Sequence, residues 1–295
     1  MKRKVLQISM VILFLCGLGV FLYPKLTDWY AVEHQQKTME EFQQEMTAVK
    51  EQGNDSKSQL EQLYSDMQEY NEKICKEGQE NLKDPFDYEI PSFDLKKYGF
   101  KSNIIGIIKI PAMDVELPLY LGANSENMKK GAVILGETSM PIGGENTNVV
   151  VAAHRGYQGT PMFRDIEVLA PGDRIEITTP FDVLTYQVTE TKVVLPDEIN
   201  EILIEEGKDK ITLLTCHPYT KNTYRYLVYG ERCKNSSELV KTDKFTKAES
   251  KKTQDLEEKS SSERRIWLET YVPFIGAGVI FLLILCGLLW KKKRK

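Results

Sequence analysis

Eight short, β-rich runs between residues 104 and 232 constrain the fold of this chain more than any other feature. Turn signals separate them, such as Gly-Ala-Asn at 122–124 and Pro-Gly-Asp at 171–173. Because few long helical patterns interrupt the runs, they predict a mainly β domain, an eight-stranded closed or nearly closed barrel with short helices. The runs are 104–110, 115–121, 132–135, 147–153, 174–179, 183–194, 211–215 and 224–232.

Two charge-free blocks, each of about 20 residues, lie near the ends of the chain at 5–23 and 271–290, and this length crosses about 30 Å of hydrocarbon. Basic residues precede the first block and follow the second, and positive flanks stay in the cytoplasm. We therefore expect a two-pass protein of the cell membrane, with both termini inside and the middle of the chain outside. The alternatives are a cleaved signal peptide for the first block and a buried core helix for the second. Bulky residues at 22–25 and the basic stop argue against them.

The segments between these blocks differ in composition. Residues 24–80 are rich in Glu, Gln, Lys and Met, and a break at 53–56 divides them into two expected helices, which either form a stalk or pack on the β domain. The tract after the last β run is too polar to bury much surface. The expected order is a cytoplasmic tip and anchor at 1–23, a juxtamembrane helical segment at 24–80, a loop at 81–97, the β-barrel at 98–233, a polar tether at 234–270, a transmembrane helix at 271–290 and a basic tail at 291–295.

Composition and spacing argue against two classes of function. A formal net charge of −4, with no basic stripe through the middle, argues against nucleic acid as a partner. No CxxC or HxxxH spacing indicates a metal site, although the acidic loops leave bound Ca²⁺ open. Outside the predicted spans the cysteines are Cys75, Cys216 and Cys233. A disulfide between Cys75 and Cys233 is one arrangement, and three reduced thiols are the other.

Three reactive side chains stand at the ends of predicted strands. Cys216 follows the apolar run 211–214, and His154 follows the apolar run 149–153. Arg225 comes nine positions after Cys216, so a hairpin would return it to the end of the Cys216 strand. A thiol, an imidazole and a guanidinium supply a nucleophile, a proton carrier and an oxyanion stabiliser, which is enough for acyl transfer through a thioester.

Each of these assignments has a competitor. Cys216 could be a small buried hydrophobic residue, the commonest fate of a cysteine. His217 adjoins it, but adjacent strand residues point to opposite faces, which favours His154 as the partner. Among the arginines, Arg155 should point away from His154, and Arg232 lies at the far end of the last strand.

The TLLTC motif at 212–216, followed by Arg225, resembles the signature of the sortase family. The strand leading into His154-Arg155-Gly156 resembles it too, and the run 106–111 is similar to the first barrel strand of that family. The resemblance covers roughly residues 81–233 and implies a sortase-type cysteine transpeptidase on a sortase-like β-barrel. The two spans and the long helical segment are most similar to class C, the pilin-polymerising sortases of Gram-positive cell walls.

The resemblance implies a role for each residue. Cys216 would attack a Thr–Gly carbonyl in an LPXTG-like signal, and Arg225 would hold the oxyanion. His154 would carry the proton, and Thr215 would help to position the substrate. The partners would be LPXTG-type pilin or surface-protein substrates, the membrane, and an amine acceptor, either a pilin lysine or a cell-wall peptide. The chemistry requires no cofactor and no metal.

Asp84-Pro85-Phe86 resembles the Asp-Pro-aromatic lid that precedes the barrel in class C sortases. By that resemblance Asp84 would pair with Arg225, and Phe86 would cover Cys216 and inhibit the resting enzyme. An ordinary acidic turn is the alternative.

The sequence departs from the family pattern at His217 and Tyr229, which leaves the substrate open. Two other functions also stay open. One is a sortase that anchors surface proteins to cell-wall peptide or mainly hydrolyses them. The other is a non-catalytic, membrane-tethered scaffold, in which Cys216→Ala would leave function intact.

Overall fold

The computed structural model describes residues 2–51, 54–80, 82, 84, 93–157, 160–219 and 221–233. The chain divides into two compact units, and one of them, Thr27–Phe245, holds the β domain. The strands of this unit are β1 (Ile104–Ile110), β2 (Val115–Leu121), β3 (Ala132–Ile134), β4 (Thr147–Ala152), β5 (Arg174–Thr178), β6 (Val183–Val194), β7 (Asp209–His217) and β8 (Tyr224–Arg232).

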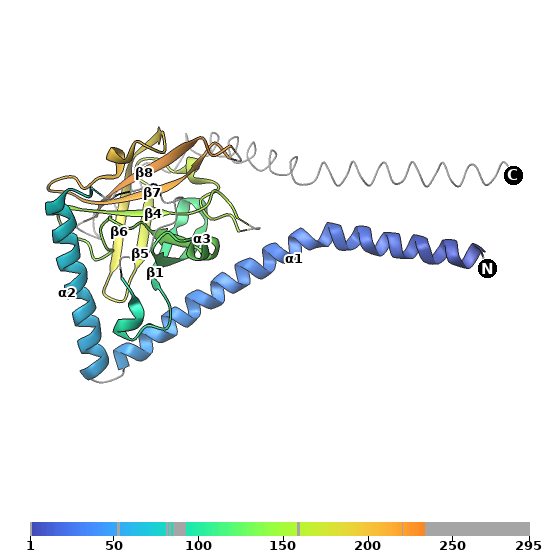
Figure 1. Cartoon of the computed structure of the whole chain (residues 1–295), viewed down its shortest axis with the longest axis horizontal. Helices are drawn as coiled ribbons and strands as arrows, with labels where there is room; N and C mark the ends of the chain where they lie inside the picture. Colours follow the sequence, from blue (N-terminus) through green and yellow to red (C-terminus); the bar gives the residue numbers. More distant parts are fainter. Residues whose placement is uncertain are drawn as a thin grey trace. The chain divides into compact units, whose positions relative to one another are not determined.

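The strands close into a barrel in the order β1-β2-β3-β4-β7-β8-β6-β5 (Figure 1). Most neighbours are antiparallel, but β2 pairs with β3 and β4 pairs with β7 in parallel. Every residue of β4 is buried, which explains why the apolar residues that follow Thr147 and Asn148 run on without alternation. The predicted mainly β fold, an eight-stranded barrel with short helices, is confirmed for the described part of the chain.

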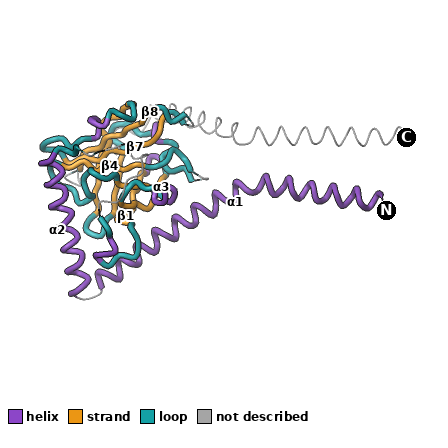
Figure 2. The backbone as a smooth tube through the Cα atoms, viewed as in Figure 1, coloured by secondary structure: helices purple, strands orange, loops and turns teal. Residues whose placement is uncertain are grey.

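The helices precede the barrel or connect its strands (Figure 2). The two long ones are α1 (Lys2–Glu51) and α2 (Asn54–Glu77). The short ones are α3 (Ser125–Lys130), η2 (Leu95–Tyr98), η3 (Pro111–Met113), η4 (Ile166–Val168) and η5 (Ile199–Ile202).

Helix α2 packs along one side of the barrel (Figures 1 and 2). Leu63 and Met67 on this helix are 0% exposed and belong to the same hydrophobic core as the strands. Asn71 accepts a hydrogen bond from the Met140 N–H at 2.7 Å and donates one to the Met140 carbonyl at 3.2 Å. The sequence left open whether the helices stand apart or pack on the barrel, and these contacts show that α2 packs.

The two ends of the chain differ in what the structure describes. Helix α1 runs without a break through Pro24, where the sequence predicted the boundary between the first anchor and the juxtamembrane segment. In the described residues, no helix meets the length and hydropathy needed to cross a bilayer. The predicted tether at 234–270, the second span at 271–290 and the tail at 291–295 lie outside the described residues.

No disulfide joins Cys75 to Cys216 or to Cys233 in this structure. Cys75 is exposed on α2, Cys216 is buried on β7, and Cys233 follows β8. Of the two arrangements left open by the sequence, a Cys75–Cys233 disulfide is therefore not the one in this structure.

Candidate active site

Strand pairing brings the three predicted reactive residues to one end of the barrel. Cys216 on β7 lies directly opposite Arg225 on the antiparallel strand β8. On the other side of β7, the parallel strand β4 pairs Ala152 with Leu214. His154 comes two residues after Ala152, and Cys216 comes two residues after Leu214. A parallel register therefore puts the imidazole and the thiol at the same level on neighbouring strands.

Thr215 connects the two strands at this level. Its side chain is fully buried, and its hydroxyl donates a hydrogen bond to the carbonyl of Ala153 at 2.7 Å. The Ala153 N–H donates in turn to the Leu214 carbonyl at 3.2 Å. Thr215 therefore fixes the backbone next to His154, and its predicted role in positioning the substrate stays a prediction.

The Cys216 thiol is 8% exposed, and its environment opposes ionisation. Burial is the main cause that raises the pKa of Cys216, to about 11. The positive charges of Arg225 and Arg155 lower this pKa, whereas the negative charge of Asp84 raises it. The thiol is therefore protonated at neutral pH in this conformation.

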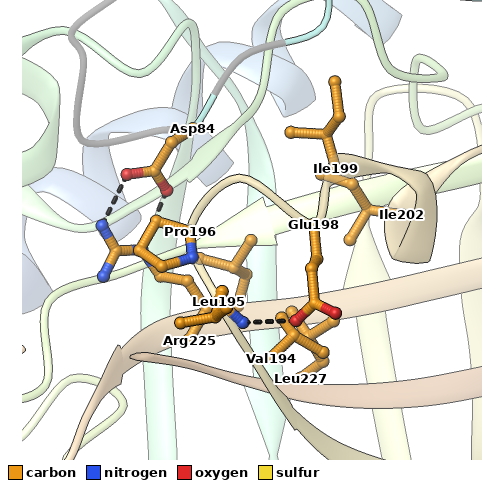
Figure 3. Close-up of a pocket in the computed structure, with 10 residues that line it drawn as sticks. Asp84, Val194, Leu195, Pro196, Glu198, Ile199, Ile202, Arg225 and Leu227 are labelled. Carbon is orange, nitrogen blue, oxygen red and sulfur yellow. Dashed lines mark hydrogen bonds and ion pairs between the residues drawn. The ribbon is translucent and has the colours of Figure 1, made fainter. Parts of the chain in front are cut away.

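Asp84, which precedes the barrel strands, forms an ion pair with Arg225. The Arg225 Nε donates to Asp84 Oδ1 at 2.9 Å, and Nη2 donates to Asp84 Oδ2 at 2.5 Å. Nη1 donates to the carbonyls of Asn222 and Tyr224. Figure 3 shows the Asp84 carboxylate facing the guanidinium. Phe86, the other predicted lid residue, lies outside the described residues.

A small pocket adjoins this ion pair (Figure 3). Its volume is about 10 Å³, close to the minimum that holds one water molecule. The lining residues come from Asp84, the end of β6, the β6–β7 connection, and strands β7 and β8: Asp84, Val194, Leu195, Pro196, Glu198, Ile199, Ile202, Leu214, Arg225 and Leu227.

The His154 ring is stacked and partly withdrawn from water. It lies almost parallel to the Tyr157 ring, at an interplanar angle of 18° and a centroid distance of 4.9 Å. Burial lowers the pKa of His154, and the positive charge of Lys129 lowers it further. The imidazole is therefore neutral at neutral pH, when the thiol is also uncharged.

Two residues that the sequence offered as alternatives to His154 and Arg225 make other contacts. His217 contacts Arg155, whose Nη1 lies 2.7 Å from His217 Nδ1. Arg232 lies 3.6 Å from Asp182 and over the Tyr186 ring, away from the end of β7 that bears Cys216. Neither His217 nor Arg232 replaces His154 or Arg225 in the arrangement around the thiol.

Three residues near the site were missed from the sequence: Lys129, Tyr157 and Glu167. Tyr157 closely follows the His154-Arg155-Gly156 motif, so its position was a usable signal. Glu167 lies on η4 and reaches Arg155 only through the folded loop. In the part of the chain that the structure describes, no three His, Cys, Asp or Glu side chains gather as a metal site would require.

Comparisons with known proteins identify the family. A crystal structure of Streptococcus pneumoniae sortase C superimposes with a TM-score of 0.59 at 32% sequence identity, covering 97% of that chain and 68% of this one. The chain belongs to the sortase family. A sortase C structure from Clostridium perfringens, solved with the C-terminal cell wall sorting motif, has a TM-score of 0.56 at 32% identity and covers 99% of that chain and 68% of this one.

Sequence comparisons agree with the sortase assignment. The sortase domain profile matches residues 108–233. Sortase A of Listeria monocytogenes is 34% identical over 148 residues, which is 50% of this chain and 61% of that protein. The chain spans only 60–63% of the length of three such curated sortases. The matched part of this sortase contains His154, Cys216 and Arg225, whereas Asp84 precedes the matched domain.

Proposed function

We propose that this sortase is a membrane-anchored cysteine transpeptidase that cleaves an LPXTG-like sorting signal and joins it to a pilin lysine. One observation carries the proposal: Cys216 and Arg225 lie opposite each other on β7 and β8, and His154 ends the strand on the other side of β7. This juxtaposition supplies the nucleophile, the oxyanion stabiliser and the proton carrier of an acyl transfer.

In the first step the Cys216 sulfur bonds to the threonine carbonyl carbon of the signal, and the oxygen takes up negative charge. Arg225 is the charged donor for that oxygen once Asp84 has left it, and charge-assisted hydrogen bonds of this kind are about twice as strong as neutral ones. The Thr–Gly bond then breaks. His154, which takes up the thiol proton, returns it to the leaving glycine amine.

In the second step the amine of the acceptor attacks the thioester. The new amide bond forms, the carbon–sulfur bond breaks, and His154 accepts the proton that the amine loses. A lowered pKa suits this role, because His154 stays neutral at the pH where it must take a proton.

The pilin assignment rests on the solved relatives. The S. pneumoniae sortase C structure was reported for its insights into catalysis and pilin substrate specificity, and the C. perfringens sortase C structure contains a cell wall sorting motif. The charge-free blocks at 5–23 and 271–290 support two membrane anchors with the barrel outside the cell. Anchored substrates would then meet the enzyme at a raised effective concentration.

We further propose that the structure is the resting, closed state of a lid. Asp84 neutralises Arg225 with two hydrogen bonds, so a substrate oxyanion cannot reach it. The pocket beside the pair is too small for a side chain, and the pKa of Cys216 is raised. A sorting signal would have to displace Asp84 before it could react.

The test is product analysis by mass spectrometry with the full chain purified in detergent. An LPXTG-type peptide is incubated with a pilin-derived lysine peptide, with a cell-wall-type peptide amine, or without an acceptor. The proposal predicts a new isopeptide bond to the lysine peptide, its loss in Cys216→Ala, and its retention in Cys75→Ala, which changes an exposed cysteine. Transfer only to the cell-wall amine would contradict the pilin assignment, and turnover by Cys216→Ala would contradict the mechanism.

A further inference from the structure

A second set of polar and charged side chains adjoins the site in sequence and is not used by the mechanism. Arg155 follows His154 in sequence, and His217 follows Cys216. Arg155 and His217 contact each other, with Arg155 Nη1 at 2.7 Å from His217 Nδ1. Arg155, which follows the proposed proton carrier, is therefore in contact with His217, which follows the proposed nucleophile.

Glu167 on η4 completes this set. Its Oε1 lies 2.7 Å from Arg155 Nη2 and 3.1 Å from His217 Nδ1. The Arg155 Nε donates to the carbonyl of Arg164 at 3.4 Å, so each guanidinium nitrogen of Arg155 has a partner. The Arg155 side chain is only 7% exposed. A buried arginine held at all its nitrogens has one rotamer, which makes it a rigid connection between the strand ends.

The protonation of His217 follows from these contacts. An arginine can only donate, so His217 Nδ1 accepts from Arg155 when the ring is neutral with its proton on Nε2, whereas a proton on Nδ1 would be donated to Glu167. Burial, followed by the charge of Arg155, lowers the pKa of His217, and Glu167 raises it; the net lowering favours a neutral ring. The groups that face the ring are Arg155 from the segment after β4, Glu167 from η4 and Tyr226 from β8, whose ring centroid lies 5.6 Å away.

We propose that Arg155, Glu167 and His217 form a positioning clamp that holds His154 and Cys216 at the spacing required for proton transfer. The proposal rests on the transpeptidase function proposed above. In this proposal the clamp residues are positioning residues and take no part in bond making or proton transfer. They act through their sequence neighbours, and Arg155 also places a positive charge close enough to favour the Cys216 thiolate. A displacement of about 1 Å between reacting groups can lower a rate by about 100-fold, so a loosened clamp should affect turnover more than binding.

The first test measures kcat and KM of the full chain, purified in detergent, with an LPXTG-type peptide. Glu167→Gln removes the charge that holds Arg155 and should lower kcat by about tenfold or more, with KM changing less than about twofold. The matched control is Glu176→Gln. Glu176 also pairs with one arginine, Arg174 at 3.3 Å, but it lies on β5, which neighbours neither β4 nor β7. A kcat within about twofold of the wild-type value in Glu167→Gln would overturn the clamp.

A rescue series separates positioning from mere stability. His217→Asn keeps a side-chain oxygen able to accept from Arg155, whereas His217→Leu does not. The clamp predicts a higher kcat in His217→Asn than in His217→Leu when both variants have the same melting temperature. Equal kcat values in the two variants would overturn it.

The second readout needs no substrate. The rate of Cys216 alkylation by iodoacetamide at about pH 8 should fall several-fold in Arg155→Gln, because a nearby positive charge that favours the thiolate is lost. Loosening of the fold alone would expose the thiol and speed alkylation, so an unchanged or faster rate would overturn the clamp. If the wild-type chain turns over no peptide, the proposed function fails. The alkylation rate of Cys216 needs no substrate, so it still tests the clamp.

Discussion

The lid makes a quantitative prediction about thiol reactivity. In Asp84→Ala the carboxylate that raises the pKa of Cys216 is gone, and Arg225, which lowers that pKa, is no longer neutralised. The lid also loses two hydrogen bonds that hold it over the site. The variant should therefore contain more thiolate at a given pH, and the thiolate is the species that alkylating agents attack.

The size of the effect follows from the pKa of Cys216, which is about 11 against an ordinary value of 9.0. Burial is the main cause of this shift and the charge of Asp84 is a smaller one, so a complete return to the ordinary value is an upper limit. It would raise the thiolate fraction at pH 8 by about 100-fold, since each unit of pKa is a factor of ten. A thiolate of lower pKa is also a weaker nucleophile, which removes about a factor of ten. We therefore expect alkylation of Cys216 to become faster by a factor between about two and ten.

The assay is a time course of iodoacetamide labelling of the full chain at pH 8, with Cys216 followed by peptide mapping. Cys75 is exposed and serves as an internal reference. The matched control is Asp94→Ala, which removes the aspartate that caps η2 and does not contact Arg225. An alkylation rate in Asp84→Ala equal to that of wild type would refute the lid.

Three further predictions test the site and the packing of α2. Arg225→Lys should slow thioester formation by about 100-fold or more in single-turnover kinetics, because an ammonium lacks the fork that binds an oxyanion; a change below about tenfold would contradict the role of Arg225. Asn71→Leu should lower the free energy of unfolding by about 2 kcal/mol in urea denaturation, because the Met140 N–H loses its partner, whereas the Met140 carbonyl keeps the Ile142 N–H. An unchanged urea midpoint would show that the contact does not matter. The melting temperature should fall as the pH drops below about 6.5. The reason is that His154 and His217 have lowered pKa values in the folded state, so the unfolded state binds more protons in this range. A flat profile of melting temperature down to about pH 5.5 would contradict both shifts.

The sequence predicted the barrel because its strands are short β-rich runs separated by turn signals. The boundaries predicted for β1, β2, β6 and β8 agree with the structure to the residue. Strand β7 is longer than predicted, because Asp209 pairs with Thr147 on β4 and His217 pairs with Tyr224 on β8. Hydropathy does not indicate a strand at these polar ends, and only the neighbouring strands keep them extended.

Helix α1 crosses a predicted boundary. The sequence was divided at residue 23, where the charge-free block 5–23 ends. The helix passes through this position without a break, although proline removes a backbone donor. The division between anchor and juxtamembrane segment therefore rests on composition and stays a prediction.

The candidate site was partly predictable. Cys216 and His154 stood out because a reactive group at the end of an apolar strand is both fixed and close to the surface. Arg225 stood out because a hairpin returns it beside Cys216. The contributions of Tyr157 and Glu167 depend on how the loop after β4 folds back, and no periodic pattern encodes that.

The central claim is that Cys216 forms a thioester with a sorting signal, and mass spectrometry of the acylated chain tests it most directly. The Asp84→Ala chain is mixed with an LPXTG-type peptide, quenched at low pH and digested, so that the adduct can be assigned to one cysteine. The account predicts an acyl adduct on the peptide that contains Cys216, removed by an added amine and absent in Cys216→Ala. An adduct on Cys75, or none while iodoacetamide still labels Cys216, would contradict it.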